Sequence, residues 1–115
     1  MQTSTRVEVE QSQGITLMRL KGEITSTSGA PIFESYENIE NSTTKILLDF
    51  SEVEYLNSSG LGFVIQLLMK ARSSGKTVDC CGLTPHFQKV FTLVGLTNYI
   101  RLHSSELAAR DALMG

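Results

Sequence analysis

Residues 45–62 read KILLDFSEVEYLNSSGLG, and this stretch decides the fold. It begins with the apolar run Ile46-Leu47-Leu48, which predicts a central strand covered by other elements. We interpret the polar residues 51–58 as a connection that leads to the next element. From Ser59 to Ser74 apolar residues recur at helical spacing. The stretch therefore predicts a strand whose carboxyl end leads, through a short loop, into a helix.

Strand and helix patterns continue on both sides of this stretch. Upstream, residues 7–21 alternate in polarity around Gln13-Gly14, which is typical of an edge hairpin. Ser28 is a candidate cap for a helix that contains Pro31 in its first turn and ends at residues 41–44. Downstream, the chain predicts four more elements, which are a strand over 77–81, a helix from Thr84-Pro85 to Gly95, a strand over 99–102 and a final helix capped by Ser104.

The order ββαβαβαβα predicts a layered α/β domain with a partly parallel sheet. At 115 residues the chain has the size of one domain, so we expect residues 1–115 to form a single unit. We expect a mixed sheet of about five strands with about four helices. Hydrophobic residues make up 41% of the chain and charged residues 19%, which is typical of a globular protein that folds alone.

Composition also excludes several classes of partner. The formal net charge is −2, and no run of Lys or Arg provides the positive surface that nucleic-acid binding needs. The longest apolar stretch, residues 61–69, is interrupted by Gln66 and is too short to cross a bilayer. The first residues are polar and do not resemble a signal peptide. We therefore expect a cytoplasmic protein with no nucleic-acid or membrane partner.

The sequence contains no pattern of residues that predicts a catalytic or metal-binding site. Cys80 and Cys81 are adjacent and lack C-x-x-C spacing, so we interpret them as reduced thiols that fill space rather than as a redox pair. The two histidines, His86 and His103, have no second ligand at metal spacing. The Gly75-Lys76-Thr77 run follows a helix, whereas a phosphate-binding loop precedes one. A hydrolase triad containing Ser58 lacks the glycine that the nucleophile turn requires. We expect no enzyme activity, cofactor or metal.

The loop-to-helix junction at Ser58 carries the functional hypothesis. Two hydroxyls and two glycines lie where a helix begins, close to unpaired N–H groups and about half a positive charge. A phosphate on Ser58 would be tolerated there, and it would block any partner lying flat against the site. The other interpretation is that Ser58 or Ser59 simply caps the helix.

The helix that follows supports a partner-facing surface. One face carries the expected core residues Leu61, Val64, Ile65, Leu68 and Ala71. Phe63 falls on the opposite, mostly polar face, where a large aromatic side chain gains little unless a partner covers it. The other interpretation is that Phe63 packs under a neighbouring loop.

Four segments together resemble the STAS domain of bacterial anti-sigma factor antagonists, and the resemblance covers nearly the whole chain. They are residues 48–51, residues 57–62, Gly22-Glu23-Ile24 and residues 90–96. The resemblance implies that an anti-sigma factor, which is also a serine kinase, phosphorylates Ser58. It also implies that the unphosphorylated antagonist binds this kinase and frees a sigma factor, and that a phosphatase acting on phospho-Ser58 restores binding.

The chain departs from the family pattern at two positions. Asn57 stands where the family has an aspartate, and Thr25 stands where an acidic residue usually follows the Gly-Glu-Ile run. Both changes remove a carboxylate from the expected interface, so either the partner has fewer basic groups or phosphorylation has been lost. We expect a monomer or weak dimer whose partner-binding residues are Gly22, Glu23, Thr25, Asn57, Ser59, Gly60 and Phe63.

The sequence is also compatible with two other functions. One is a scaffold or transporter-accessory STAS subunit that never receives phosphate, as Asn57 in place of aspartate suggests. The other is a nucleotide-binding or hydrolytic module, against which the lack of a glycine-rich phosphate loop argues.

Overall fold

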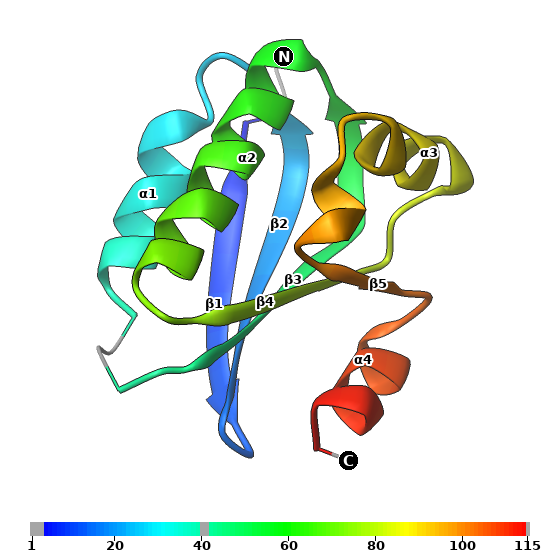
Figure 1. Ribbon diagram of the computed structural model, residues 1–115. Coiled ribbons are helices and arrows are strands. Elements are labelled where there is room, and N and C mark those ends of the chain that lie inside the picture. Colours follow the sequence, from blue (N-terminus) through cyan, green and yellow to red (C-terminus); the bar gives the residue numbers. More distant parts are fainter. Residues whose placement is uncertain (1–3, 40–41, 115) are drawn as a thin grey trace.

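The computed structural model describes residues 4–39 and 42–114. Within these ranges five strands form one sheet, in the order in which they occur along the chain (Figure 1). They are β1 (Arg6–Ser12), β2 (Ile15–Ile24), β3 (Lys45–Leu56), β4 (Thr77–Cys81) and β5 (Arg101–His103). β1 is antiparallel to β2, and all other neighbours are parallel. The predicted mixed sheet and layered α/β domain are confirmed.

Three helices connect the parallel strands, and a fourth follows the last strand (Figure 1). They are α1 (Gly29–Glu37), α2 (Ser58–Ser73), α3 (Pro85–Leu93) and α4 (Glu106–Met114), and a short 3-10 turn, η1 (Leu96–Asn98), follows α3. Successive crossovers of the same hand that run in one direction leave their helices on one face of the sheet, and α1, α2 and α3 lie together on one face.

Among the described residues, no helix has the length and apolar character needed to span a membrane.

Two hydrophobic clusters cover the two faces of the sheet. The larger one joins β2, β3 and β4 to α1, α2 and α3, and the smaller one consists of Ile15, Leu17, Leu47, Cys81, Ala109 and Leu113. Leu17 and Met18 are adjacent in β2 and point to opposite faces, yet both are fully buried. This double burial explains why the central strands are nearly continuous apolar runs.

The interpretation of residues 51–58 as a connection is wrong for its first part, because β3 continues to Leu56. The second half of β3 pairs with the end of β2, with Glu52 opposite Lys21 and Leu56 opposite Ile24. β4 pairs with β3 only as far as Asp49. The last part of β3 therefore extends beyond its neighbour on one side, and its polar side chains are exposed to solvent.

Several predicted boundaries also shift. α1 ends at Glu37 rather than at residues 41–44, and residues 40–41 lie outside the described residues. The last strand is three residues long and begins at Arg101. Ser105, rather than Ser104, accepts a hydrogen bond from the N–H of Ala108 at the start of α4 (3.1 Å). The cap at Thr84 lies where the sequence predicted it.

Candidate functional site

The start of α2 is pressed against the end of β2 (Figure 1). The carbonyl oxygen of Ile24 accepts a hydrogen bond from the N–H of Asn57 (3.2 Å). The same oxygen lies only 1.9 Å from the position that a Cβ on Gly60 would occupy. Glycine at position 60 therefore lets the first turn of α2 sit directly on the backbone of β2.

Asn57 caps α2, so the interpretation that Ser58 or Ser59 caps this helix is wrong. Its side-chain Oδ1 accepts the N–H of Gly60 (2.9 Å), and its carbonyl oxygen accepts the N–H of Leu61 (2.8 Å). Ser58 and Ser59 are therefore the first two residues of the helix, not its cap. Both are exposed, and neither hydroxyl has a hydrogen-bond partner among residues 4–39 and 42–114.

The electrostatics at this helix start favour an anion. The first N–H groups of a helix have no partner within the helix, and the aligned peptide dipoles place about half a positive charge there. The first turn of α2 contains no acidic residue, and Lys70 and Arg72 lie in its last turn. The cap residue Asn57 is itself uncharged. A negative group at Ser58 therefore meets no like charge from the first turn of its own helix.

The end of β2 brings two more predicted residues, Gly22 and Glu23, beside this helix start. Glu23 and Ile24 lie opposite Tyr55 and Leu56 in the parallel ladder. Gly22, which adopts a positive φ of 84°, lies beside a register shift. Gly22 and Gly60 are both buried, so they shape the backbone beneath a surface rather than form its outer layer.

The turn from β2 to α1 is held by Ser28. Its hydroxyl donates to the carbonyl oxygen of Glu23 (3.3 Å) and accepts from the N–H of Thr25 (2.7 Å). Ser28 occupies the cap position of α1 but makes no side-chain cap hydrogen bond there, so the predicted cap is wrong in this respect. Glu23 and Thr25 are half-buried and lie at the same edge of the sheet as Ser58.

The expectation that Phe63 lies exposed on a polar face is wrong. Its ring is half-buried and packs edge-on against Phe33 of α1, with ring centres 6.1 Å apart and an angle of 81° between the planes. Gly29 leaves room for this ring, because a Cβ there would lie 3.0 Å from it. Leu67 also belongs to the buried face, which the helical pattern had not included. Whether Phe63 touches a partner remains a prediction.

A groove beside Ser58 was not anticipated from the sequence. It has a volume of about 310 Å³ and lies between the junction of β3 and α2 on one side and α3 on the other. Its lining residues are Tyr55, Leu56, Asn57, Ser58, Leu61, His86, Phe87 and Val90. The two walls are about thirty residues apart in the chain, so no local pattern could reveal them as neighbours.

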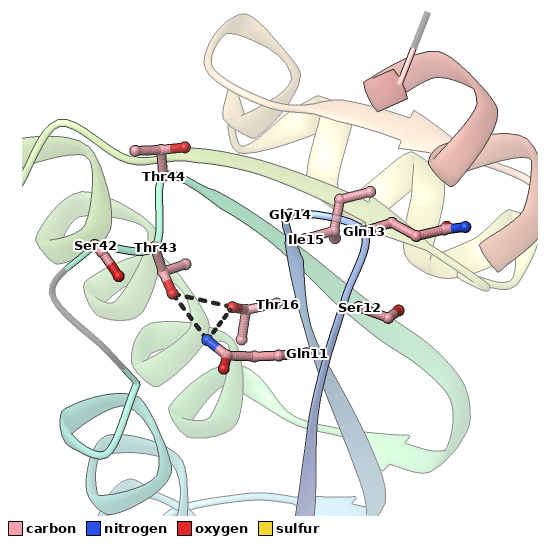
Figure 2. A pocket seen from close by; sticks show the side chains of 9 residues that line it. All are labelled: Gln11, Ser12, Gln13, Gly14, Ile15, Thr16, Ser42, Thr43 and Thr44. Carbon is pink, nitrogen blue, oxygen red and sulfur yellow. Dashed lines mark hydrogen bonds between the residues drawn. The ribbon is translucent and has the colours of Figure 1, made fainter.

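A larger cavity of about 470 Å³ lies at the opposite edge of the sheet, where β2 and β3 begin (Figure 2). Gln11 Nε2 donates to the hydroxyls of Thr16 and Thr43 (3.2 Å each), and these hydroxyls lie 3.1 Å apart. The bonds tie the segment before β3 to the hairpin, which gives these residues a structural role. The cavity lining contains no charged side chain, and no group of three or more His, Cys, Asp or Glu within residues 4–39 and 42–114 is arranged to hold a metal ion. We therefore place the candidate site at Ser58.

Charged residues on the α4 side of the sheet form a structural network. Asp49 accepts hydrogen bonds from Arg19 Nε (3.0 Å) and from the N–H of Ser51 (2.9 Å). Burial alone would raise the pKa of Asp49, but these hydrogen bonds outweigh it and lower the pKa below the usual range. Arg19 also contacts Glu106 of α4 (2.8 Å). The network joins β2, β3 and α4.

The two cysteines are free and buried, in agreement with reduced, space-filling thiols. Burial and the nearby Asp49 raise the pKa of Cys81 to about 12. Burial likewise raises the pKa of Cys80. Because the thiolate is the reactive form, both side chains are unsuited to nucleophilic chemistry.

Comparison with known proteins identifies the family. A model of the STAS domain matches residues 6–109. The chain belongs to the STAS domain family. A relative of this STAS domain is the anti-sigma F factor antagonist of Paenibacillus polymyxa, which is 24% identical over 110 residues that cover 94% of each chain.

Two solved structures share the fold of this STAS domain. The Bacillus cell fate determinant SpoIIAA in the phosphorylated form has a TM-score of 0.67 and 21% identity, over 93% of this chain and 98% of that one. A sulfate transporter family protein from Wolinella succinogenes has a TM-score of 0.72 and 11% identity, over 91% and 90%. Because proteins with different names share the fold, the fold alone does not choose a function.

Proposed function

We propose that this STAS domain is an anti-sigma factor antagonist that switches partners through phosphorylation of Ser58. With Ser58 unmodified, it binds an anti-sigma factor that is also a serine kinase, and this binding frees a sigma factor. Phosphorylation releases the kinase, and a phosphatase reverses the change. The observation that carries the proposal is the Ser58 hydroxyl, which is exposed at the first residue of α2 and has no hydrogen-bond partner among the described residues.

The relatives supply the class of partner. The Paenibacillus polymyxa relative bears the name of an anti-sigma factor antagonist, and the Bacillus SpoIIAA structure is of a phosphorylated form. In this proposal the chain is a substrate of the kinase rather than an enzyme. It acts in the cytoplasm, where sigma factors direct transcription.

Two features favour Ser58 over Ser59 as the acceptor. Ser58 lines the groove between α2 and α3, whereas Ser59 does not. Ser58 also matches the phosphoacceptor position of the family pattern. A phosphate on Ser58 would therefore lie where a partner contacts the groove, at the centre of the surface it must block.

Phosphorylation at Ser58 would leave this domain folded. The hydroxyl makes no bond that the phosphate would break, and the cap of α2 is made by Asn57. A phosphate carries about −1.5 to −2 charges, and the start of a helix stabilises negative charge. Asn57 stands where the family has an aspartate. Its side chain keeps the capping oxygen but carries no negative charge that would repel the phosphate. Asn57 is thus compatible with a phosphorylated neighbour.

The partner surface we propose combines two adjacent strand ends. Glu23 and Thr25 contribute from the end of β2, and Asn57, Ser58 and Ser59 contribute from the start of α2. Gly22 and Gly60 set the backbone beneath this surface. Phe63 lies at its border, against α1.

The test is phosphorylation by the anti-sigma factor kinase of the same organism with ATP, followed by intact-mass measurement. We expect one added phosphoryl group in the wild type and in Ser59→Ala, and none in Ser58→Ala. Both variants change an exposed serine in the same helical turn, so they are matched for effects on folding. If Ser58→Ala is modified at full yield, the acceptor assignment is wrong.

A second candidate is a STAS scaffold or transporter-accessory subunit that receives no phosphate. It is favoured by the missing carboxylates at Asn57 and Thr25. Intact-mass measurement on protein from its native cells in several growth states separates the two. A scaffold gives a single unmodified species in every state, whereas the switch gives a phosphorylated species in at least one.

A further inference from the structure

His86 lies across the groove from the start of α2. Thr84 caps α3 by accepting the N–H of Phe87 (3.2 Å), and Pro85 is the first helical residue. This cap makes His86 the second residue of α3. Its side chain is exposed and makes no hydrogen bond with the described part of the chain, although its ring lies 5.7 Å from that of Phe87.

The two walls of the groove therefore each begin a helix. Ser58 is the first residue of α2, and His86 is the second residue of α3. Both line the same space of about 310 Å³, which holds roughly ten water molecules at about 30 Å³ each. A phosphoryl group is much smaller than this volume.

The lining residues give such a phosphoryl group one cationic partner. Apart from phosphorylated Ser58, the titratable side chains in the lining are Tyr55 and His86, and the lining contains no carboxylate. The nearest charged residues in sequence, Glu54 on β3 and Lys89 on α3, are exposed and lie outside the lining. Free histidine gains its charge near pH 6.5, and a phosphoserine loses its second proton near pH 6.

We propose that His86 binds the phosphoryl group of phosphorylated Ser58 and holds it in the groove between α2 and α3. This inference rests on the proposed phosphorylation of Ser58. The bound phosphate covers the apolar part of the groove, formed by Leu61, Phe87 and Val90. The partner then loses an apolar docking surface in addition to meeting a negative charge.

The experiment uses full-length protein with phosphoserine incorporated at position 58 during translation, so it does not depend on any kinase. The phosphorus-31 chemical shift is followed from pH 4.5 to 8.5. We expect the phosphate of the wild type to titrate at a lower pH than in His86→Gln, by a few tenths of a pH unit, as for an exposed ion pair. His86→Lys, which restores a positive charge, should bring the midpoint back down.

Lys89→Gln is the matched control, because it removes a positive charge from the same helix outside the groove. It should leave the midpoint close to that of the wild type. The proposal is overturned if His86→Gln titrates like the wild type, or if Lys89→Gln shifts the midpoint as much as His86→Gln does. Failure of the proposed function has a different signature, which is absence of modification by the kinase while the titration difference persists.

Discussion

Replacing Gly60 by alanine tests how α2 is seated on the sheet. A Cβ at Gly60 would lie 1.9 Å from the carbonyl oxygen of Ile24 and 2.4 Å from its carbonyl carbon. Both atoms belong to the backbone of β2, so no change of rotamer relieves the clash. Gly62 is two residues further along the same helix and has no atom within 4 Å of its Cβ position. Gly62→Ala is therefore the matched control.

The expected energies differ in sign. Forcing a group into a closed site costs about 1–3 kcal/mol, and moving α2 away from β2 also weakens the hydrogen bond from Asn57 to Ile24, which is worth about 1 kcal/mol. Gly60→Ala should lose about 2–4 kcal/mol of unfolding free energy. Gly62→Ala should gain about 0.5–1 kcal/mol, because alanine favours the helix interior.

Urea unfolding followed by circular dichroism measures both free energies, and thermal unfolding provides a check. At roughly 4 °C per kcal/mol for a domain of this size, the melting temperatures of the two variants should differ by about 10 °C or more. If Gly60→Ala comes within about 0.5 kcal/mol of Gly62→Ala, the close contact between α2 and β2 is absent. In that case α2 is not held against β2 in the way that exposes Ser58.

Three further predictions concern the cap, the thiols and the buried carboxylate. Asn57→Ala should lose about 1 kcal/mol in urea unfolding, whereas Asn57→Asp should retain the wild-type value or exceed it slightly, because aspartate keeps the cap and adds a favourable charge. Cys80 and Cys81 should resist alkylation in the native protein at pH 8 and react fully in urea, as counted by mass; rapid native labelling would contradict their burial. Because the pKa of Asp49 is lowered in the folded state, its contribution to stability is present above about pH 4 and is lost as the pH falls through the folded value. Between pH 5 and 2.5, the free energy of unfolding measured in urea should therefore fall less steeply with decreasing pH in Asp49→Asn than in the wild type. Equal slopes for the two proteins would rule out a role for the pair of Asp49 and Arg19.

The fold was predictable because each element carries a local signal. The hairpin turn at Gln13-Gly14, the apolar run before Asp49 and the Thr84-Pro85 cap all lie where the sequence predicted them. The second half of β3 was missed for a physical reason. Its residues are polar because that part of the strand extends past β4, so it is held by pairing with β2 rather than by burial.

The candidate site was predictable only in part. The sequence indicated the junction at Ser58, but we assigned the possible cap to Ser58 or Ser59 rather than to Asn57, since all three side chains can accept the same hydrogen bond. We predicted that Phe63 is exposed because its neighbours on α2 are mostly polar. In the structure Phe33 of α1 covers it, and the sequence of α2 alone does not indicate this contact. The groove with His86 depends on how α3 packs beside α2, and no spacing within either segment encodes that contact.

The most direct test of the switch is the affinity of the anti-sigma factor kinase for two forms of the full chain. One form is unmodified, and the other carries phosphoserine incorporated at position 58. Isothermal titration calorimetry in the presence of a non-hydrolysable ATP analogue measures both affinities without turnover. Placing a dianion in a desolvated contact should weaken binding at least about a hundredfold, which is roughly 2.7 kcal/mol. Equal affinities for the two forms would contradict the proposed function.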